Sequence, residues 1–162
     1  MTQAEFREIF DQYFEQLRNY IFYRSGDTDL ATDIVQEAFI KLWEKRIKPG
    51  EHKIKGLLYK MAGDLYISSY RKQKRTMEMR FIIKNDFVAE QSPEEKAQFE
   101  ELNTMYTKAL NNLPEKQRTV FLMSRMDELK YYEIATRLGI SIKAVEKRMT
   151  QALAALRKAL DY

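Results

Sequence analysis

A short basic stretch near the end of the chain, LGISIKAVEKRM at residues 138–149, carries side chains suited to binding anions. It contains the cations Lys143, Lys147 and Arg148, and it includes Ser141, whose hydroxyl can cap a helix. Cationic side chains at the exposed start of a helix are what docking in the major groove of DNA requires. The question is whether this helix binds DNA or is an ordinary amphipathic helix.

The residues before this stretch predict a second helix that crosses it. Ile134 and Leu138 give an apolar face to a short helix, and Gly139 permits the left-handed backbone at its end. Two helices joined by so short a turn must cross steeply, as in a helix-turn-helix. Periodicity alone fits an ordinary helical hairpin with solvated lysines equally well. The small Ala135, the glycine and the cap at Ser141 favour the DNA-binding motif.

A second basic segment, LLYKMAGDLYISSYRKQKR at residues 57–75, combines tyrosines with a cationic end. Aromatic rings stack on unpaired bases while neighbouring cations hold the phosphates, so this composition suits separated DNA strands or RNA. The candidate residues are Tyr66, Tyr70, Arg71, Lys72, Lys74 and Arg75. The alternative is that the tyrosines lie in the core and the basic end matches the helix dipole. Tyrosine composition by itself favours that alternative.

The segment DIVQEAFIKLW, residues 33–43, predicts a helix with an unusual polar face. Its apolar residues fill one broad side, which must face the core. The opposite side holds Asp33, Gln36, Glu37 and Glu44, with Ile40 in their midst and Trp43 at the border. An isoleucine surrounded by acids and flanked by a tryptophan resembles a protein-binding patch with a basic partner. A solvated acidic face with one stray apolar residue is the alternative.

Residues that could perform catalysis are scarce in this chain. It has no cysteine, and its one histidine, His52, is expected to be solvent-exposed in the turn PGEHK without metal-ligand spacing around it. There is no glycine-rich phosphate loop and no nucleophile elbow. We therefore expect no catalytic residues, no metal, no cofactor and no enzymatic activity.

Helices must position all of these segments. The 162 residues are 44% hydrophobic, which suffices for a core, and include only 5 Gly and 3 Pro, too few turn-formers for an all-β fold. We expect an all-α fold of two small helical domains, residues 1–84 and 96–162, joined by a linker at 85–95, with the second domain a helix-turn-helix. Ser92, Pro93 and Glu95 form a capping box that starts a helix.

Charge alternates along the chain in four blocks. The net charge is −3 over residues 1–46, +7 over 47–85, −4 over 86–110 and +4 over 111–162. Basic blocks suit phosphate backbones. The first residues lack the pattern of a signal peptide, and no apolar run approaches membrane-spanning length. Together with the absence of cysteine, this predicts a cytoplasmic protein without membrane insertion.

The order of the predicted elements resembles that of a bacterial RNA polymerase sigma factor of the extracytoplasmic-function (ECF) group. It runs from an acidic and apolar helix through a basic aromatic helix and a linker to a C-terminal helix-turn-helix. The segment DIVQEAFIKLW is similar to the family's polymerase-binding helix at Asp33, Gln36, Glu37, Phe39 and Trp43. Residues 113–157 are similar to its promoter-reading domain. The resemblance implies a transcription initiation factor that binds core RNA polymerase.

The resemblance also assigns roles at the promoter. It implies that Asp64 and the basic aromatic residues help to melt the minus-ten element as single-stranded DNA, and that Ser141, Lys143, Lys147 and Arg148 bind the minus-thirty-five element as double-stranded DNA. It further implies an anti-sigma factor as a partner.

Several residues depart from the family pattern. Asp64 replaces a usual asparagine and Ser68 a common aspartate. An ionised Asp64 only accepts hydrogen bonds, which predicts an altered base preference, such as for a cytosine amino group. Glu128 and Lys130 replace a usual glycine and serine before the first helix of the motif, and Lys147 replaces a common asparagine.

Two other classes of protein fit parts of the sequence. A stand-alone helix-turn-helix repressor should dimerise and bind a palindrome without polymerase. A helical adaptor or anti-sigma protein should bind proteins only.

Overall fold

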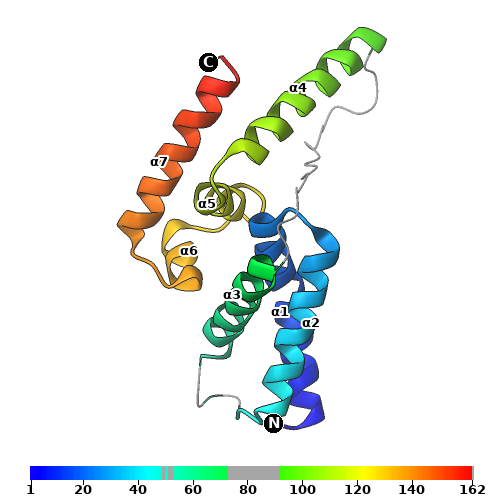
Figure 1. Cartoon of the computed structure of the whole chain (residues 1–162), viewed down its shortest axis with the longest axis vertical. Coiled ribbons are helices and arrows are strands. Elements are labelled where there is room, and N and C mark those ends of the chain that lie inside the picture. The colour runs from blue at the N-terminus through cyan, green and yellow to red at the C-terminus, as the bar shows by residue number, and fades with distance from the viewer. Residues whose placement is uncertain (49, 51–52, 73–91, 162) are drawn as a thin grey trace.

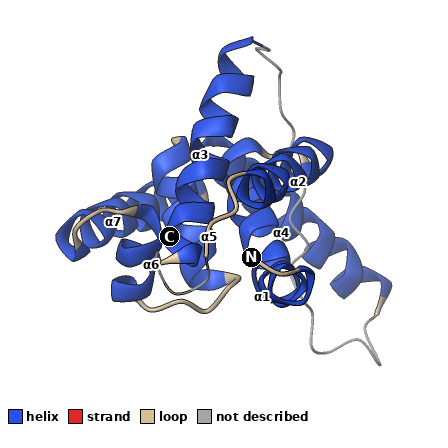
Figure 2. Ribbon diagram, turned by 90° about the horizontal axis from the view of Figure 1, so that it is seen from below, coloured by secondary structure: helices blue, strands red, loops and turns tan. Residues whose placement is uncertain are grey.

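Seven helices make up the secondary structure of the residues that the computed structural model describes, namely 1–48, 50, 53–72 and 92–161. They are α1 (Gln3–Ser25), α2 (Thr28–Glu44), α3 (Ile54–Lys72), α4 (Pro93–Asn112), α5 (Glu115–Arg125), α6 (Tyr131–Leu138) and α7 (Ile142–Ala159) (Figure 1). Figure 2 shows helices and loops throughout the described part of the chain. The predicted all-α fold is confirmed.

Capping residues define where the first two helices begin and end. The Thr2 hydroxyl accepts a hydrogen bond from the amide of Glu5 at 3.2 Å, and the Glu5 carboxylate accepts one from the amide of Thr2 at 2.7 Å. Helix α1 ends at Gly26, whose φ of +71° is left-handed. The carboxylate of Asp27 then accepts from the amide of Leu30 at 3.0 Å. Because of this cap, α2 begins two residues earlier than its apolar pattern indicates.

Helices α1, α2 and α3 pack around a shared apolar core. Its largest fully buried side chains are Leu17, Ile21, Val35, Phe39, Leu42 and Leu58. The Phe39 ring lies 5.0 Å from that of Phe10 and is 2% exposed. Phe39, which the family resemblance includes in the polymerase-binding helix, is therefore a core residue and not part of the surface of α2.

Helices α4 to α7 form the second half of the molecule. Its largest fully buried side chains are Leu110, Val120, Leu122, Met123, Ile134 and Val145. The capping box that the sequence predicts before α4 is present. The hydroxyl of Ser92 accepts from the amide of Glu95 at 3.2 Å, and the carboxylate of Glu95 accepts from the amide of Ser92 at 3.0 Å. Pro93 is the first residue of the helix.

The two halves pack against each other. Helix α5 lies between α1 and α7, and α6 packs on α3 (Figure 1). Their buried apolar side chains form one continuous cluster. The linker that the sequence predicts at 85–95 falls largely outside the described residues, so the division of the chain at that point stays a prediction. No helix in the described ranges has both the length and the apolar character to cross a membrane.

Candidate nucleic-acid and protein interfaces

The helix-turn-helix is built by α6 and α7. Helix α6 ends at Gly139, whose φ of +66° is left-handed and whose amide donates to the carbonyl of Ala135. The hydroxyl of Ser141 accepts a hydrogen bond from the amide of Ala144 at 3.1 Å and so caps α7. Ile134 of α6 and Val145 of α7 are fully buried. The turn and the cap that the sequence predicts here are confirmed.

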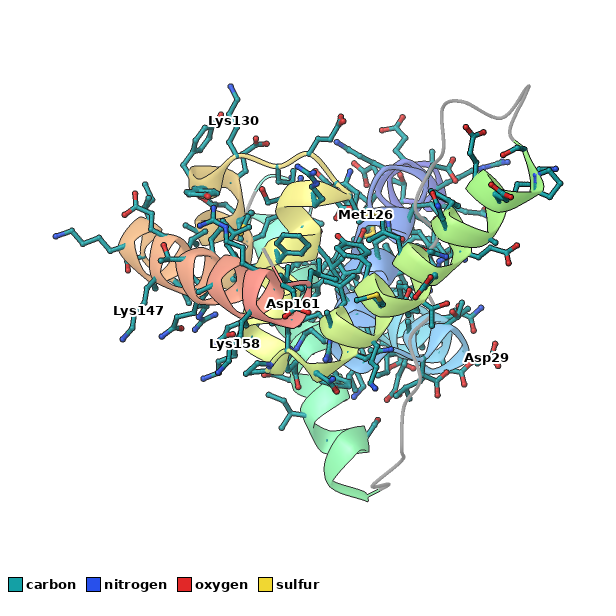
Figure 3. All side chains as sticks on the ribbon, turned by 90° about the horizontal axis from the view of Figure 1, so that it is seen from above. Asp29, Met126, Lys130, Lys147, Lys158 and Asp161 are labelled. Atoms are coloured by element: carbon teal, nitrogen blue, oxygen red, sulfur yellow. The ribbon has the colours of Figure 1, made fainter. Side chains whose placement is uncertain are left out.

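The first two turns of α7 present cations on the surface. Lys143 and Lys147 are exposed, and Arg148 is half-buried. Figure 3 shows Lys147 pointing away from the helices. Beside it lies a hollow of about 830 Å³ that Lys147, Arg148 and Gln151 line together with the start of α5 and the end of α1. Lys147 and Arg148 therefore share the surface of this hollow, whereas Lys143 is exposed but does not line it.

Helix α3 exposes polar side chains and buries Tyr66, which the sequence offered as a residue that could stack on bases. Asp64 and Ser68 are exposed. Tyr66 is 2% exposed, and its hydroxyl donates to the carbonyl of Arg24 at 3.3 Å. The Arg24 guanidinium lies over the Tyr66 ring at 4.7 Å. In this structure Tyr66 is thus a core residue rather than a stacking platform for bases, as the alternative based on composition indicates.

The rest of the basic aromatic segment is only partly described. The backbone of Tyr70, Arg71 and Lys72 is helical, but their side chains lie outside the described residues. Lys74, Arg75 and His52 lie entirely outside the described residues. A hollow of about 490 Å³ lies between α3 and α6, and Asp64, Lys60 and Arg137 are among the residues that line it.

The polar face of α2 carries the mixture of acidic and apolar side chains that the sequence predicts. Asp33, Gln36 and Glu37 are exposed. Ile40 is 57% exposed and Trp43 is 43% exposed, although both are large apolar residues. The ring of Phe6 meets that of Trp43 edge-on at 5.1 Å, which holds the indole in place on the surface. This face can offer an apolar anchor within a negative rim.

Contacts between the two halves were missed by the sequence reasoning. The hydroxyl of Tyr23 donates to the carboxylate of Asp127 at 2.6 Å, and Arg24 pairs with Glu115 at 2.7 Å. Burial raises the pKa of the Tyr23 hydroxyl, and the hydrogen bond to Asp127 raises it further. Burial also raises the pKa of Asp127. No local pattern signals these pairs, since their members lie 104 and 91 residues apart in the sequence.

Within the described ranges, no group of three or more His, Cys, Asp or Glu side chains is arranged to hold a metal ion. The surfaces described above can bind other macromolecules through charge and apolar contact.

Comparisons with known proteins match both halves of the chain. The family model for Sigma-70 region 2 matches residues 9–76, and the model for Sigma-70, region 4 matches residues 104–156. The ECF RNA polymerase sigma factor SigW of Bacillus subtilis is 30% identical over 171 residues, covering 98% of this chain and 90% of SigW. The RNA polymerase sigma factor YlaC of the same organism is 26% identical, covering 93% of this chain and 89% of YlaC.

Solved structures share the fold along the whole chain. The sigma factor RpoE, in complex with the anti-sigma factor NepR from Bartonella quintana, matches with a TM-score of 0.64 and 20% identity over 97% of both chains. CnrH, in complex with the cytosolic domain of CnrY, matches with a TM-score of 0.63 and 19% identity over 99% of this chain and 90% of CnrH. With the similarity to SigW and the two matched regions, the chain belongs to the ECF group of RNA polymerase sigma factors and is a transcription initiation factor that directs the polymerase to promoters.

Proposed function

We propose that this sigma factor binds core RNA polymerase through the exposed face of α2. The contact residues are Asp33, Gln36, Glu37, Ile40 and Trp43. Interface anchors are typically apolar or aromatic side chains with a polar rim, and Ile40 and Trp43 within an acidic surround have this form. The exposure of Ile40, at 57%, is the observation that carries the assignment. Phe39 is excluded because it is buried.

We propose that α3 and the residues after it bind the minus-ten element. Asp64 faces the surface and accepts hydrogen bonds when ionised, so it suits a cytosine amino group. Tyr70, Arg71, Lys72, Lys74 and Arg75 complete this site as the family resemblance implies. Tyr66 is left out because its ring is buried against Arg24. If the substitution Asp64→Asn leaves minus-ten selectivity unchanged, the proposed role of Asp64 is wrong.

We propose that the start of α7 binds the minus-thirty-five element. Ser141, Lys143, Lys147 and Arg148 lie in its cap and first two turns, where a recognition helix meets base edges and phosphates. We assign at least one of the three cations to a phosphate, which fixes register without reading sequence.

We propose an anti-sigma factor as the regulator of this chain, and the cytoplasm as its compartment, with no catalytic activity of its own. The support is the likeness to RpoE and CnrH, whose solved complexes contain NepR and the cytosolic domain of CnrY. A stand-alone repressor is not favoured, because both sigma-70 regions are matched along the chain.

The experiment that tests this function uses purified core polymerase. The parent chain should associate with the polymerase in a pull-down at low salt and support transcription from a pool of random promoters. Ile40→Ala should weaken association about 30-fold, the usual effect of removing an interface anchor of about 2 kcal/mol. Met126→Ala is the matched control, because Met126 is 50% exposed on the other half of the chain. Failure of the parent chain to associate contradicts the proposal.

A further inference from the structure

The outward face of α7 carries an uncharged polar side chain, Gln151, beside its cations. Gln151 follows Lys147 by four residues, so the two side chains are neighbours on one face of the helix. Both are exposed, whereas Val145 and Met149 on the opposite face are buried. Lysine only donates hydrogen bonds, but the carboxamide of glutamine donates from one end and accepts at the other. Which end of Gln151 faces outward therefore decides which base edges it can bind.

A side chain of α5 holds the carboxamide of Gln151. Nε2 of Gln117 donates a hydrogen bond to Oε1 of Gln151, with 3.3 Å between the two atoms. Gln117 lies in the first turn of α5, is half-buried and lines the hollow of about 830 Å³ together with Gln151. The two residues are 34 positions apart in the sequence, so the packing of α5 on α7 forms this pair.

The hydrogen bond from Gln117 sets the orientation of the Gln151 carboxamide. The oxygen and nitrogen of a carboxamide point to opposite sides of their carbon, so an oxygen held toward Gln117 turns the NH2 group away from α5. The group that faces outward then only donates. In the major groove, guanine presents the acceptors N7 and O6 and thymine presents the acceptor O4, whereas cytosine presents an N4 donor. Gln151 in this orientation suits guanine or thymine.

A glutamine with two free ends has a different preference. It binds adenine through two hydrogen bonds, because it donates to N7 and accepts from N6. Gln117 turns away the oxygen that the contact with N6 needs. The presence of Gln117 therefore changes the base that Gln151 recognises best.

We propose that Gln117 is a positioning residue, which orients Gln151 to read a guanine or a thymine in the minus-thirty-five element. The inference rests on the proposed function of α7 and adds a base-reading residue to its three cations. Gln117 acts through Gln151 and needs no contact with DNA of its own. A partner on a second helix also limits the rotamers of Gln151 before DNA binds, which lowers the entropy lost on binding.

The test changes the hydrogen-bonding character of Gln117 and leaves Gln151 in place. Gln117→Glu supplies an acceptor of similar shape, so the NH2 group of Gln151 turns toward α5 and its oxygen faces outward. An outward oxygen accepts from cytosine N4 or adenine N6. Gln117→Met removes both hydrogen-bonding groups at similar length, so both ends of Gln151 become free. Gln151→Met removes the proposed reader itself.

The matched control for the charge of Gln117→Glu is Lys116→Gln. This substitution also lowers the net charge by one, at the neighbouring and exposed position of α5. A lower positive charge near the phosphates weakens binding to all sequences alike, without changing the ratio between bases. Lys116→Gln should therefore bind DNA more weakly and keep the base preference of the parent.

Each variant is assembled with core polymerase and transcribes a pool of promoters with a randomised minus-thirty-five element. The frequency of each base among the transcribed promoters gives the selectivity at each position. The parent should prefer guanine or thymine to cytosine about tenfold at one position, and Gln151→Met should lose the preference at that position alone. Gln117→Met should shift the preference there toward adenine, and Gln117→Glu should shift it toward cytosine or adenine.

Circular dichroism during thermal unfolding checks the fold of each variant. Gln117→Met and Gln117→Glu change the same contact in different ways, so either one tests the inference if the other does not fold. The same preference in the parent and in a folded Gln117 variant shows that Gln117 does not orient Gln151, and this overturns the inference.

Two further results also overturn the inference. An unchanged preference in Gln151→Met shows that Gln151 reads no base. A shift in Lys116→Gln equal to that in Gln117→Glu shows that charge, not orientation, sets the preference. Failure of the parent to transcribe from any promoter in the pool is a different outcome, since it contradicts the proposed function of α7 and the inference with it.

Discussion

Tyr59 shows how burial changes the chemistry of a single side chain. The residue is 3% exposed in α3, with the Tyr20 ring at 5.0 Å and the Arg137 guanidinium at 5.8 Å from its ring. Burial raises the pKa of Tyr59 to about 12 from an ordinary value of 10.0, although the charge of Arg137 lowers it in part. The folded state therefore keeps the proton of Tyr59 at a pH where the unfolded chain has lost it.

This pKa shift predicts a loss of stability in alkali. The stabilisation is fully present below pH 10, where an unfolded tyrosine is neutral, and it is lost as the pH rises from 10 through 12. At pH 11, which is one unit above the ordinary tyrosine pKa, the folded protein has lost about 1.4 kcal/mol of this stabilisation. Urea unfolding at pH 8 and pH 11 should show a smaller drop in the Tyr59→Phe variant than in the parent. Tyr132→Phe is the control, because Tyr132 is 57% exposed. An equal drop in the Tyr59→Phe variant and the parent contradicts the prediction.

At the scale of the element, the loop that leads into α6 has a strained backbone at a residue that departs from the family pattern. Glu128, where a glycine is usual in the family, has a φ of +54°. A side chain in this left-handed region costs about 1 kcal/mol relative to glycine. Lys130, which stands in place of a usual serine, occupies the N-cap, and the carboxylate of Glu133 accepts a hydrogen bond from its amide at 3.1 Å. A lysine side chain has no acceptor with which to complete the cap. The two departures therefore weaken the start of the helix-turn-helix.

A glycine at position 128 should stabilise the protein, whereas a glycine within a helix should destabilise it. Glu128→Gly should raise the free energy of unfolding by about 1 kcal/mol because it relieves the left-handed strain. Glu146→Gly, on the exposed side of α7, should lower it by about 1 kcal/mol because glycine is a poor helix former. Chemical denaturation of both variants measures the two values. Shifts of the same sign would contradict the strain at Glu128.

At the scale of the whole molecule, the ion pair between Arg24 and Glu115 makes the packing of the two halves sensitive to salt. The Arg24 and Glu115 side chains are partly exposed, so dissolved ions screen their attraction. Raising the ionic strength from 0.05 M to 0.5 M should therefore weaken the contribution of this pair to the free energy of unfolding by about 0.5 kcal/mol, as urea denaturation measures. The Glu115→Gln variant should respond less, because it has no charge at this position. Equal responses of parent and variant would show that the pair does not stabilise the packing of the two halves.

Much of the local structure could be predicted from sequence. Gly139 marks the turn because a left-handed backbone favours glycine. Ser141 and Ser92 mark the starts of α7 and α4 because a free amide in the first turn needs a nearby acceptor. The exposure of Ile40 and Trp43 also follows from the helical period of α2. These features depend on residues a few positions apart, so the pattern of residue types alone was sufficient.

The tertiary structure alone decided how the two halves meet and which tyrosines are available. Whether Tyr66 faces solvent depends on Arg24, 42 residues away in the chain, and the capping of α1 depends on Arg118, 94 and 95 residues away. Such contacts form only when the chain has already brought the elements together, so residue types at local spacing carry no sign of them. The sequence by itself determined the helices and their caps; packing determined that Tyr66 is buried and that Arg118 caps α1, because burial and long-range hydrogen bonds are properties of the assembled fold.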